Sequence, residues 1–379
     1  MIYLDNSATT YPKPPQVIRA VHEASSRYGF NPGRGGYRQS LKTAEKIYNV
    51  RTKAKEFFGV YDETGVIFTG GCTEALNTVI KGVLRKGDHV VISSLEHNAV
   101  VRPLHRLKEQ GIISYSVAEL GENDEETLHH FRDKINSHTR LMICTHASNV
   151  FGTRLPVERL CALAHSNGVL FCLDAAQSAG MFDIDLNRDG YDFVCCAGHK
   201  YLYGPMGIGL LLLGNDRIID TLREGGTGSE SSSYEMPRYY PDRLEAGTLN
   251  VPGIIGLGSG LSFVSSRGID KIYRSESSWI RQLYRQFSTI PSIQMYTEIS
   301  QLDRNAPVLS LNVKEKNSEE IARILGESYD ICVRGGLHCA PLAHQTLGTS
   351  ETGTVRIAPS VFSTEYDRGI LVNSLRKIN

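Results

Sequence analysis

Short apolar runs alternate with longer stretches of helical periodicity through more than half of the chain. The runs have the length of buried strands, and the stretches repeat apolar residues at helical spacing. The predicted strands are Val66–Thr69, His89–Ser93, Ile113–Val117, Leu141–Thr145, Val169–Asp174, Phe193–Ala197 and Gly209–Leu213. The predicted helices are Ser40–Phe58, Thr73–Leu84, His97–Gln110, Glu126–Ile135 and Val157–Asn167. This alternation predicts an α/β fold with a mainly parallel sheet and helices on both faces.

The pattern changes after the last of these strands. Residues Gly225 to Pro252 are rich in Gly, Ser, Pro and Tyr and show little periodicity, and such a loop inside a compact domain is usually functional. Beyond it the pattern predicts a smaller α+β domain. Its expected helices are Ile254–Arg267 and Ile269–Ile290, and its expected strands lie near Val308–Val313, Ile331–Arg334 and Thr354–Ala358.

Composition narrows the class of protein. Lys plus Arg and Asp plus Glu both number 41, so net charge favours neither a nucleic-acid partner nor an anionic membrane surface. No apolar run approaches the ~18 residues of a membrane span, and we expect no signal peptide. The eight cysteines contain no C-x-x-C pair, and several stand inside predicted strands. This pattern indicates reduced thiols in the cytoplasm rather than disulfides or a metal site.

One lysine stands in an unusual place. Lys200 follows a predicted buried strand through Gly198 and His199, and a glycine-rich turn leads on to the next strand. An ammonium group there is costly unless it has a use. Its pKa can be lowered so that it acts as an amine nucleophile, as in Schiff-base lysines. Taken alone, the lysine could equally cap a strand end or face solvent.

Two further features point to pyridoxal 5'-phosphate (PLP). Asp174 ends another apolar strand, and PLP enzymes pair a Schiff-base lysine with a carboxylate that keeps the pyridine nitrogen protonated. Ligands of open α/β sheets lie at such strand ends. Gly70 and Gly71 open a predicted helix whose free N–H groups suit a phosphate, although Thr73 alone could be a simple N-cap.

With these residues in place, the chain resembles the class V (fold-type I) PLP enzymes, and within them the group II cysteine desulfurases and selenocysteine lyases. The matching segments, in family order, are Tyr3–Thr10, Thr69–Asn77, Leu95–Ala99, Ser148–Gly152, Asp174–Gln177, Gly198–Pro205, Glu245–Asn250, Arg334–Ala340 and Val355–Ile357. The resemblance implies a seven-stranded large domain over residues 16–262, and a small domain formed by residues 1–15 and 263–379. It also implies a homodimer in which Thr248 reaches the phosphate bound by the partner.

The resemblance assigns the site residues. Catalysis falls to Lys200, Cys339 and His97. The cofactor-binding residues are Cys72, Thr73, His97, Asn149, Asp174, Gln177, His199, Lys200 and Thr248. The substrate-binding residues are Asn149, Arg356, Arg334 and Arg34. Two departures bear on the phosphate site, because Ala197 stands where better-known desulfurases have serine and Cys72 where threonine is frequent.

The presence of Cys339 distinguishes between the reactions that the resemblance allows. It lies in a loop marked by Gly and Pro residues, beside His338 and near Arg334. An exposed cysteine in a basic setting is a candidate nucleophile, although most cysteines in loops have no catalytic role. The resemblance implies a cysteine desulfurase that converts L-cysteine to L-alanine and carries the sulfur as a persulfide to an acceptor protein. The alternatives are a selenocysteine lyase, another class V aminotransferase or lyase that needs no thiol, and a non-catalytic protein on the same fold. The sulfur would serve iron–sulfur cluster assembly, a thiolated cofactor, tRNA or a selenium pathway.

Overall fold

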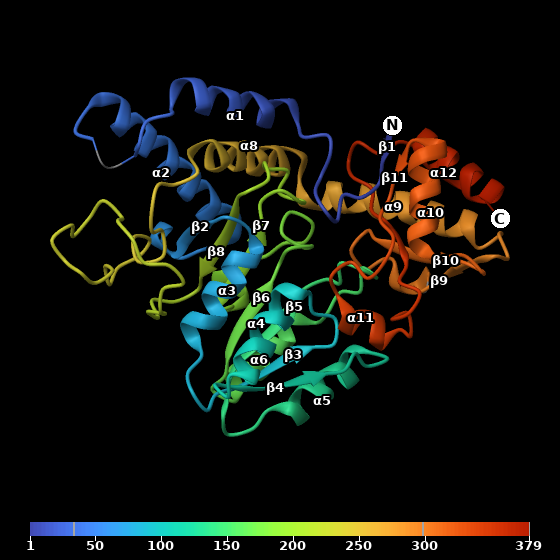
Figure 1. Cartoon of the computed structure of the whole chain (residues 1–379), viewed down its shortest axis with the longest axis horizontal. Coiled ribbons are helices and arrows are strands. Elements are labelled where there is room, and N and C mark those ends of the chain that lie inside the picture. Colours follow the sequence, from blue (N-terminus) through green and yellow to red (C-terminus); the bar gives the residue numbers. More distant parts are fainter. Residues whose placement is uncertain (33–34, 298, 379) are drawn as a thin grey trace.

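The computed structural model describes residues 1–32, 35–297 and 299–378. A seven-stranded sheet forms the centre of the larger part of the chain (Figure 1). In spatial order its strands are β2 (Val66–Thr69), β8 (Gly209–Leu213), β7 (Phe193–Ala197), β6 (Leu170–Asp174), β5 (Thr139–Thr145), β3 (His89–Ser93) and β4 (Ser114–Ala118). β8 runs opposite to the other six strands, which all point the same way. The predicted mainly parallel α/β sheet is confirmed.

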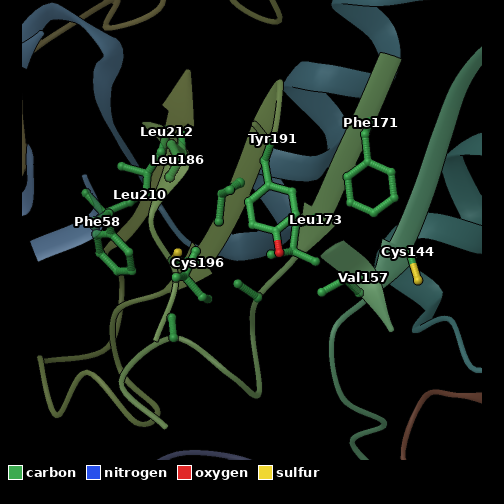
Figure 2. Close-up of a cluster of buried hydrophobic side chains, with 14 of the residues drawn as sticks. Phe58, Cys144, Val157, Phe171, Leu173, Leu186, Tyr191, Cys196, Leu210 and Leu212 are labelled. Atoms are coloured by element: carbon green, nitrogen blue, oxygen red, sulfur yellow. The ribbon is translucent and has the colours of Figure 1, made fainter. Parts of the chain in front are cut away.

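Neighbouring residues of each central strand pack into different hydrophobic clusters. In β7, Val194 and Cys196 belong to the cluster of Figure 2, whereas Phe193 and Cys195 belong to another. The longer helices packed into the first cluster are α2 (Arg38–Phe58), α5 (Asp124–Lys134), α6 (Val157–Ser166) and α8 (Val251–Arg267), and the short α7 (Leu186–Asp189) and α11 (Pro341–Thr346) also contribute to it. The helices in the second cluster are α3 (Cys72–Val83) and α4 (Asn98–Glu109). Because side chains alternate across a strand, the two clusters lie on opposite faces. Burial on both faces explains the continuous apolar runs of the sequence.

The remaining strands form two small sheets. β10 (Leu309–Val313) lies between β12 (Val355–Ile357) and β9 (Ile293–Met295), antiparallel to both. β1 (Ile2–Tyr3) pairs in parallel with β11 (Ile331–Cys332), which brings the N-terminus beside the C-terminal part of the chain. The helices here are α9 (Ile269–Phe287), α10 (Ser318–Tyr329), α11 (Pro341–Thr346) and α12 (Glu365–Ile378). A third hydrophobic cluster joins Leu4 to residues of α9, α10 and α12.

Three details differ from the sequence pattern. The pattern gave no element for α1 (Pro15–Arg27), which lies against α8 and buries only Val17 and Ala24. Two buried positions are too few to mark a helix reliably. The helix expected to reach Ile290 ends at Phe287. The proposed domain boundary at residue 262 falls inside α8, and this division stays a prediction.

Candidate active site

The functional side chains gather at one edge of the seven-stranded sheet. The carboxyl ends of β2, β5, β6 and β7 meet there because these strands point the same way. Asp174 is the last residue of β6, and Lys200 follows β7 in a tight turn. Both line a cavity of about 520 Å³. The other predicted site residues that line it are Cys72, Thr73, His97, Asn149, Gln177 and His199.

Lys200 and Asp174 form the charged centre of this cavity. Burial lowers the pKa of the Lys200 amine, and the carboxylate of Asp174 opposes that shift. Burial also raises the pKa of the Asp174 carboxyl, against the pull of Lys200 and of a hydrogen bond from the Ala176 N–H at 2.9 Å. The Cys72 thiol adds a contact to Asp174 Oδ1 at 3.4 Å. A lysine with a lowered pKa has a larger neutral fraction, as a nucleophilic or basic amine requires.

The start of α3 forms an anion cradle at the cavity wall. Gly71 is the N-cap residue and provides no side-chain cap, and Gly71, Cys72 and Thr73 line the cavity, so the helix start is available to an anion there. A close approach of β8 shapes this turn, because a Cβ at Gly209 would lie 2.6 Å from the carbonyl carbon of Gly71. Only glycine permits that distance.

Two buried polar atoms at the cavity lack partners within the described chain. They are Gln177 Oε1 and His199 Nδ1. The opposite end of Gln177 is fixed, since its Nε2 donates to the Ser7 carbonyl at 3.0 Å. Unpartnered polar atoms, an N–H cradle, a carboxylate and an amine together match the groups of PLP. The residues present therefore fit this cofactor, although Ala197 brings no hydroxyl to the cavity.

His97 is held as a neutral ring. It caps α4 by accepting a hydrogen bond at Nδ1 from the Ala99 N–H at 3.0 Å, so the proton of the neutral ring is on Nε2. Burial lowers its pKa to about 4, and the charges of Lys200 and Arg334 act in the same direction. A neutral imidazole in the cavity wall is suited to stack on an aromatic ring without adding charge.

This neutrality predicts a pH dependence of stability. Burial likewise lowers the pKa of His199 to about 4, while both rings have the ordinary pKa of about 6.5 when unfolded. Between pH 6.5 and 4 the unfolded chain binds more protons, so the free energy of unfolding should fall as the pH decreases through this window. Urea titrations at intervals of pH measure it. The stability difference between wild type and the variant His97→Gln should shrink toward pH 4, and a constant difference would contradict the assignment.

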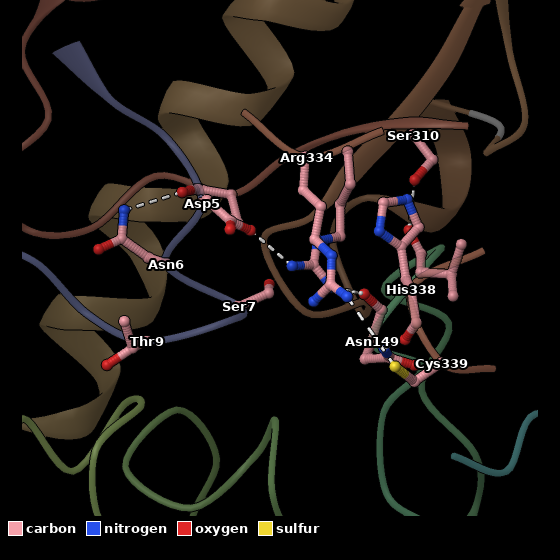
Figure 3. A network of polar contacts seen from close by, with 12 residues as sticks. Asp5, Asn6, Ser7, Thr9, Asn149, Ser310, Arg334, His338 and Cys339 are labelled. Carbon is pink, nitrogen blue, oxygen red and sulfur yellow. Dashed lines mark hydrogen bonds and ion pairs between the residues drawn. The ribbon is translucent and has the colours of Figure 1, made fainter. Parts of the chain in front are cut away.

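Cys339 stands on an exposed loop at the rim. His338 and Cys339 have positive φ angles of 49° and 59°, a region that non-glycine residues rarely adopt. Hydrogen bonds hold this conformation, because Asn98 N–H donates to the Cys339 carbonyl at 2.8 Å and Asn149 Nδ2 to the His338 carbonyl at 2.8 Å. Figure 3 shows Cys339 beside Arg334, whose Nη2 lies 3.9 Å from the thiol sulfur.

The ring of His338 faces away from that thiol. It is buried, and its Nε2 contacts the Thr354 carbonyl at 2.9 Å. His338 therefore fixes the loop instead of activating Cys339. The thiol lines a second cavity, of about 380 Å³, which shares His97 and Thr73 with the cavity of Lys200. Cys339 thus lies next to the first cavity without lining it.

Arg356, expected to clamp a substrate carboxylate, is engaged within the protein. Its side chain is 1% exposed. Nη2 lies 2.6 Å from Asp5 Oδ1, and Nη1 donates to the Asn149 carbonyl at 2.9 Å. Sequence reasoning placed Asp5 in a motif but gave it no role. The sequence carried no signal for this contact, because Asp5 lies two residues after β1 and far from Arg356 along the chain.

Other predicted residues lie outside the main cavity. Thr248 lines a separate cavity of about 150 Å³, and nearby Glu245 anchors the loop through a buried double contact with Arg51 at 2.9 and 2.8 Å. Arg34 lies outside the described residues. Sequence reasoning also missed Lys13, whose Nζ donates to the His199 carbonyl at 2.6 Å and so fixes the turn before Lys200.

The described chain holds no group of three or more His, Cys, Asp or Glu side chains arranged for a metal ion. Among the same residues, no helix combines the length and apolar character needed to cross a membrane. All eight cysteines are free thiols, six of them buried.

The chain is similar to several known proteins over its whole length. A probable cysteine desulfurase of Methanothermobacter thermautotrophicus is 34% identical over 100% of this chain and 94% of its own length. The apo structure of a cysteine desulfurase from Thermococcus onnurineus NA1 has a TM-score of 0.90 at 29% identity, covering 100% of this chain and 94% of that one. The cysteine desulfurase CsdA from Escherichia coli has a TM-score of 0.88 at 26% identity, covering 99% and 94%.

Fold and cavity together define a PLP-dependent enzyme. The model of the family described as aminotransferase class-V matches residues 2–367. The chain belongs to that family, and the resemblance expected from its sequence motifs is confirmed.

Proposed function

We propose that this protein is a cysteine desulfurase that removes sulfur from L-cysteine, releases L-alanine and holds the sulfur as a persulfide on Cys339. The observation that carries this proposal is the position of the exposed Cys339 beside a cavity that contains Lys200, Asp174 and His97. Transamination needs the lysine and the carboxylate but no thiol. The names of the relatives point to the same activity.

The residues that would hold PLP follow from the cavity. The N–H groups at the start of α3, with Thr73 and His199, would bind the phosphate. Asp174 would keep a proton on the ring nitrogen, and Gln177 would hydrogen-bond a ring oxygen. When bound, the cofactor supplies an electron sink at the amino acid's Cα. Neutral His97 would cover the ring without competing for that charge.

The reacting groups of the protein then have separate tasks. Lys200, as a free amine, would take the proton from the substrate Cα. The Cys339 thiolate would attack the substrate sulfur, so that an S–S bond forms as the Cβ–S bond breaks. Proton return completes alanine. Arg356 and Asn149 would bind the substrate carboxylate, which requires Arg356 to exchange its contact with Asp5 for the incoming carboxylate.

One assay tests the whole proposal. The purified, PLP-loaded protein is incubated with L-cysteine and dithiothreitol, and alanine and sulfide are measured together. We expect the two products in equal amounts. Formation of pyruvate, ammonia and sulfide would instead indicate a lyase reaction, and formation of 3-mercaptopyruvate a transaminase reaction.

We also propose a homodimer with shared active sites. Residues 214–250 form no helix or strand, and Thr248 stands apart from the cavity of its own chain. A polar loop of this length that does not complete its own site is suited to complete the site of a neighbouring subunit.

Thr248→Ala should weaken PLP retention in equilibrium dialysis while the KM for L-cysteine changes little, because a phosphate contact is the same with any substrate. An active monomer in sedimentation at assay concentration would contradict the dimer.

The proposed compartment is the cytoplasm. Persulfide chemistry requires a reduced thiol, and Cys339 is the exposed one among the eight free cysteines of the described chain.

A further inference from the structure

The groove next to Cys339 is strongly cationic. Besides the thiol, its wall contains three exposed basic side chains, Lys81, Arg102 and Arg106. None of the described residues that line it is acidic. Within the described chain, none of the three basic side chains forms an ion pair, unlike the exposed Arg85 and Arg323, which pair with Asp220 and Glu327. The chain has equal numbers of acidic and basic residues, whereas the lining of this groove is only basic among its charged residues.

These charges form a line that starts at the thiol. The N–H of Asn98, the first residue of α4, bonds the Cys339 carbonyl. Arg102 and Arg106 follow at successive intervals of four residues and so share one face of the helix. The line from Asn98 to Arg106 is about 12 Å long at 1.5 Å per residue. Lys81 stands on α3, which packs against α4 and forms the other wall (Figure 1).

The positive end of a helix adds to the field at the thiol. Cys339 lies against the N-terminus of α4, where the backbone N–H groups carry partial positive charge. The guanidinium of Arg334 adds its charge, with Nη2 at 3.9 Å from the sulfur. A negatively charged molecule that enters the groove would therefore be attracted along its length, up to the sulfur itself.

We infer that this groove, defined by Lys81, Arg102 and Arg106, docks an acidic segment of the protein that accepts the sulfur, with the acceptor cysteine at the Cys339 end. The inference rests on the proposed desulfurase function. An extended chain covers about 3.3 Å per residue, so the line of charge spans about four residues. The acceptor should carry its acidic side chains within roughly that distance of its cysteine.

The transfer itself is balanced without another reactant. The acceptor thiolate attacks the outer sulfur of the Cys339 persulfide, and a new S–S bond forms. The bond between the two sulfurs of the enzyme persulfide breaks, and Cys339 leaves as a thiolate that takes up a proton. Sulfur changes carrier with no net oxidation or reduction.

A protein segment fits this groove better than a nucleic acid. Nucleic-acid sites need a basic surface that follows several phosphates, often with a domain of high net positive charge. Here three basic side chains line one groove of about 380 Å³ on a chain of zero net charge. That size suits a short peptide segment.

Transfer to model peptides tests the inference. The probes are two blocked peptides with one cysteine each, followed by four glutamates in one and four glutamines in the other. Holoenzyme charged with L-cysteine is mixed with each peptide, and mass spectrometry follows the peptide persulfide. For wild type at low salt, we expect transfer to the glutamate peptide to be about tenfold faster, and the preference to shrink as salt screens the charges.

The variant that carries Lys81→Glu, Arg102→Glu and Arg106→Glu should lose or reverse this preference. The ratio of the two peptide rates, both measured on the same variant, cancels any change at the Lys200 centre. The matched control carries Lys271→Glu, Arg376→Glu and Lys377→Glu, which change the net charge equally on α9 and α12. The control should keep the wild-type ratio.

Any of three results with the peptides would overturn the inference. They are equal rates for the two peptides on wild type, an unchanged preference in the groove variant, and loss of the preference in the control. Stronger competition by a single-stranded oligonucleotide than by a cysteine-free glutamate peptide of equal charge would also reject it in favour of a nucleic-acid site. Alanine production with dithiothreitol is measured on separate aliquots of the same enzyme preparations. Its absence would refute the desulfurase function, whereas its presence with equal peptide rates refutes only the docking site.

Discussion

Replacing Cys339 with alanine should remove nearly all alanine formation from L-cysteine while PLP binding stays intact. The reason is that Cys339 lies on an exposed loop outside the cavity of Lys200, so its loss leaves the cofactor residues in place but removes the group that takes the sulfur. Loss of a catalytic nucleophile commonly costs a thousand-fold or more, so we expect at least about that decrease. Single-turnover measurements without added thiol, with alanine quantified per PLP, give the cleanest value.

The chain provides a matched control for this variant. Cys332, on β11, is the partly exposed free thiol among the described cysteines, and Cys332→Ala should behave as wild type. After one turnover, mass spectrometry should place the persulfide on Cys339 alone. With L-selenocysteine the Cys339→Ala variant should keep much more activity, because selenium leaves more readily and needs no thiol. Full L-cysteine desulfuration by Cys339→Ala would refute the proposed mechanism.

The sheet could be predicted from the sequence because burial was so complete. Strands such as β6 and β7 are buried at every position, and that produces unbroken apolar runs that periodicity detects. Helices that bury few residues were harder to predict from the sequence, and α1, with two buried residues, is the example. The antiparallel direction of β8 carries no local signal, since direction depends on how the chain returns to the sheet.

The sequence predicted those site residues that stand at the ends of strands. Asp174 and Lys200 follow apolar runs, and parallel strands bring such ends to one edge. The contact of Arg356 with Asp5 was not predictable, because it joins residues 351 positions apart through the pairing of β1 with β11. The cationic groove was also hidden. Lys81 and Arg102 look like ordinary surface residues until the packing of α3 against α4 brings them to the same groove.

The conformation of the Cys339 loop is a further property that only the structure reveals. Two consecutive non-glycine residues with positive φ angles are held by hydrogen bonds from Asn98 and Asn149. Asn98 belongs to the helix capped by His97, and Asn149 lines the cavity of Lys200. The loop that carries the thiol is therefore fastened directly to the walls of the cofactor cavity, which couples the position of Cys339 to the site where the substrate would bind.

Replacing Lys200 with alanine should abolish both the covalent attachment of PLP and the formation of alanine. Lys200 is the lysine that lines the cavity in the described chain, and its lowered pKa makes the neutral amine accessible. Loss of the group that both binds the cofactor covalently and moves the Cα proton should lower the rate by about a thousand-fold or more. Borohydride reduction followed by peptide mapping measures the attachment, and the alanine assay measures the rate.

Lys13 provides the internal comparison for that experiment. Burial lowers its pKa to about 8, so it also has a reactive amine close to the site. However, its Nζ is bound to the His199 carbonyl at 2.6 Å and does not line the cavity. Peptide mapping of reduced wild-type enzyme should therefore find the cofactor on Lys200 and leave Lys13 unmodified. Attachment at Lys13, or a reducible adduct that survives in Lys200→Ala, would show that Lys200 is not the lysine that binds the cofactor.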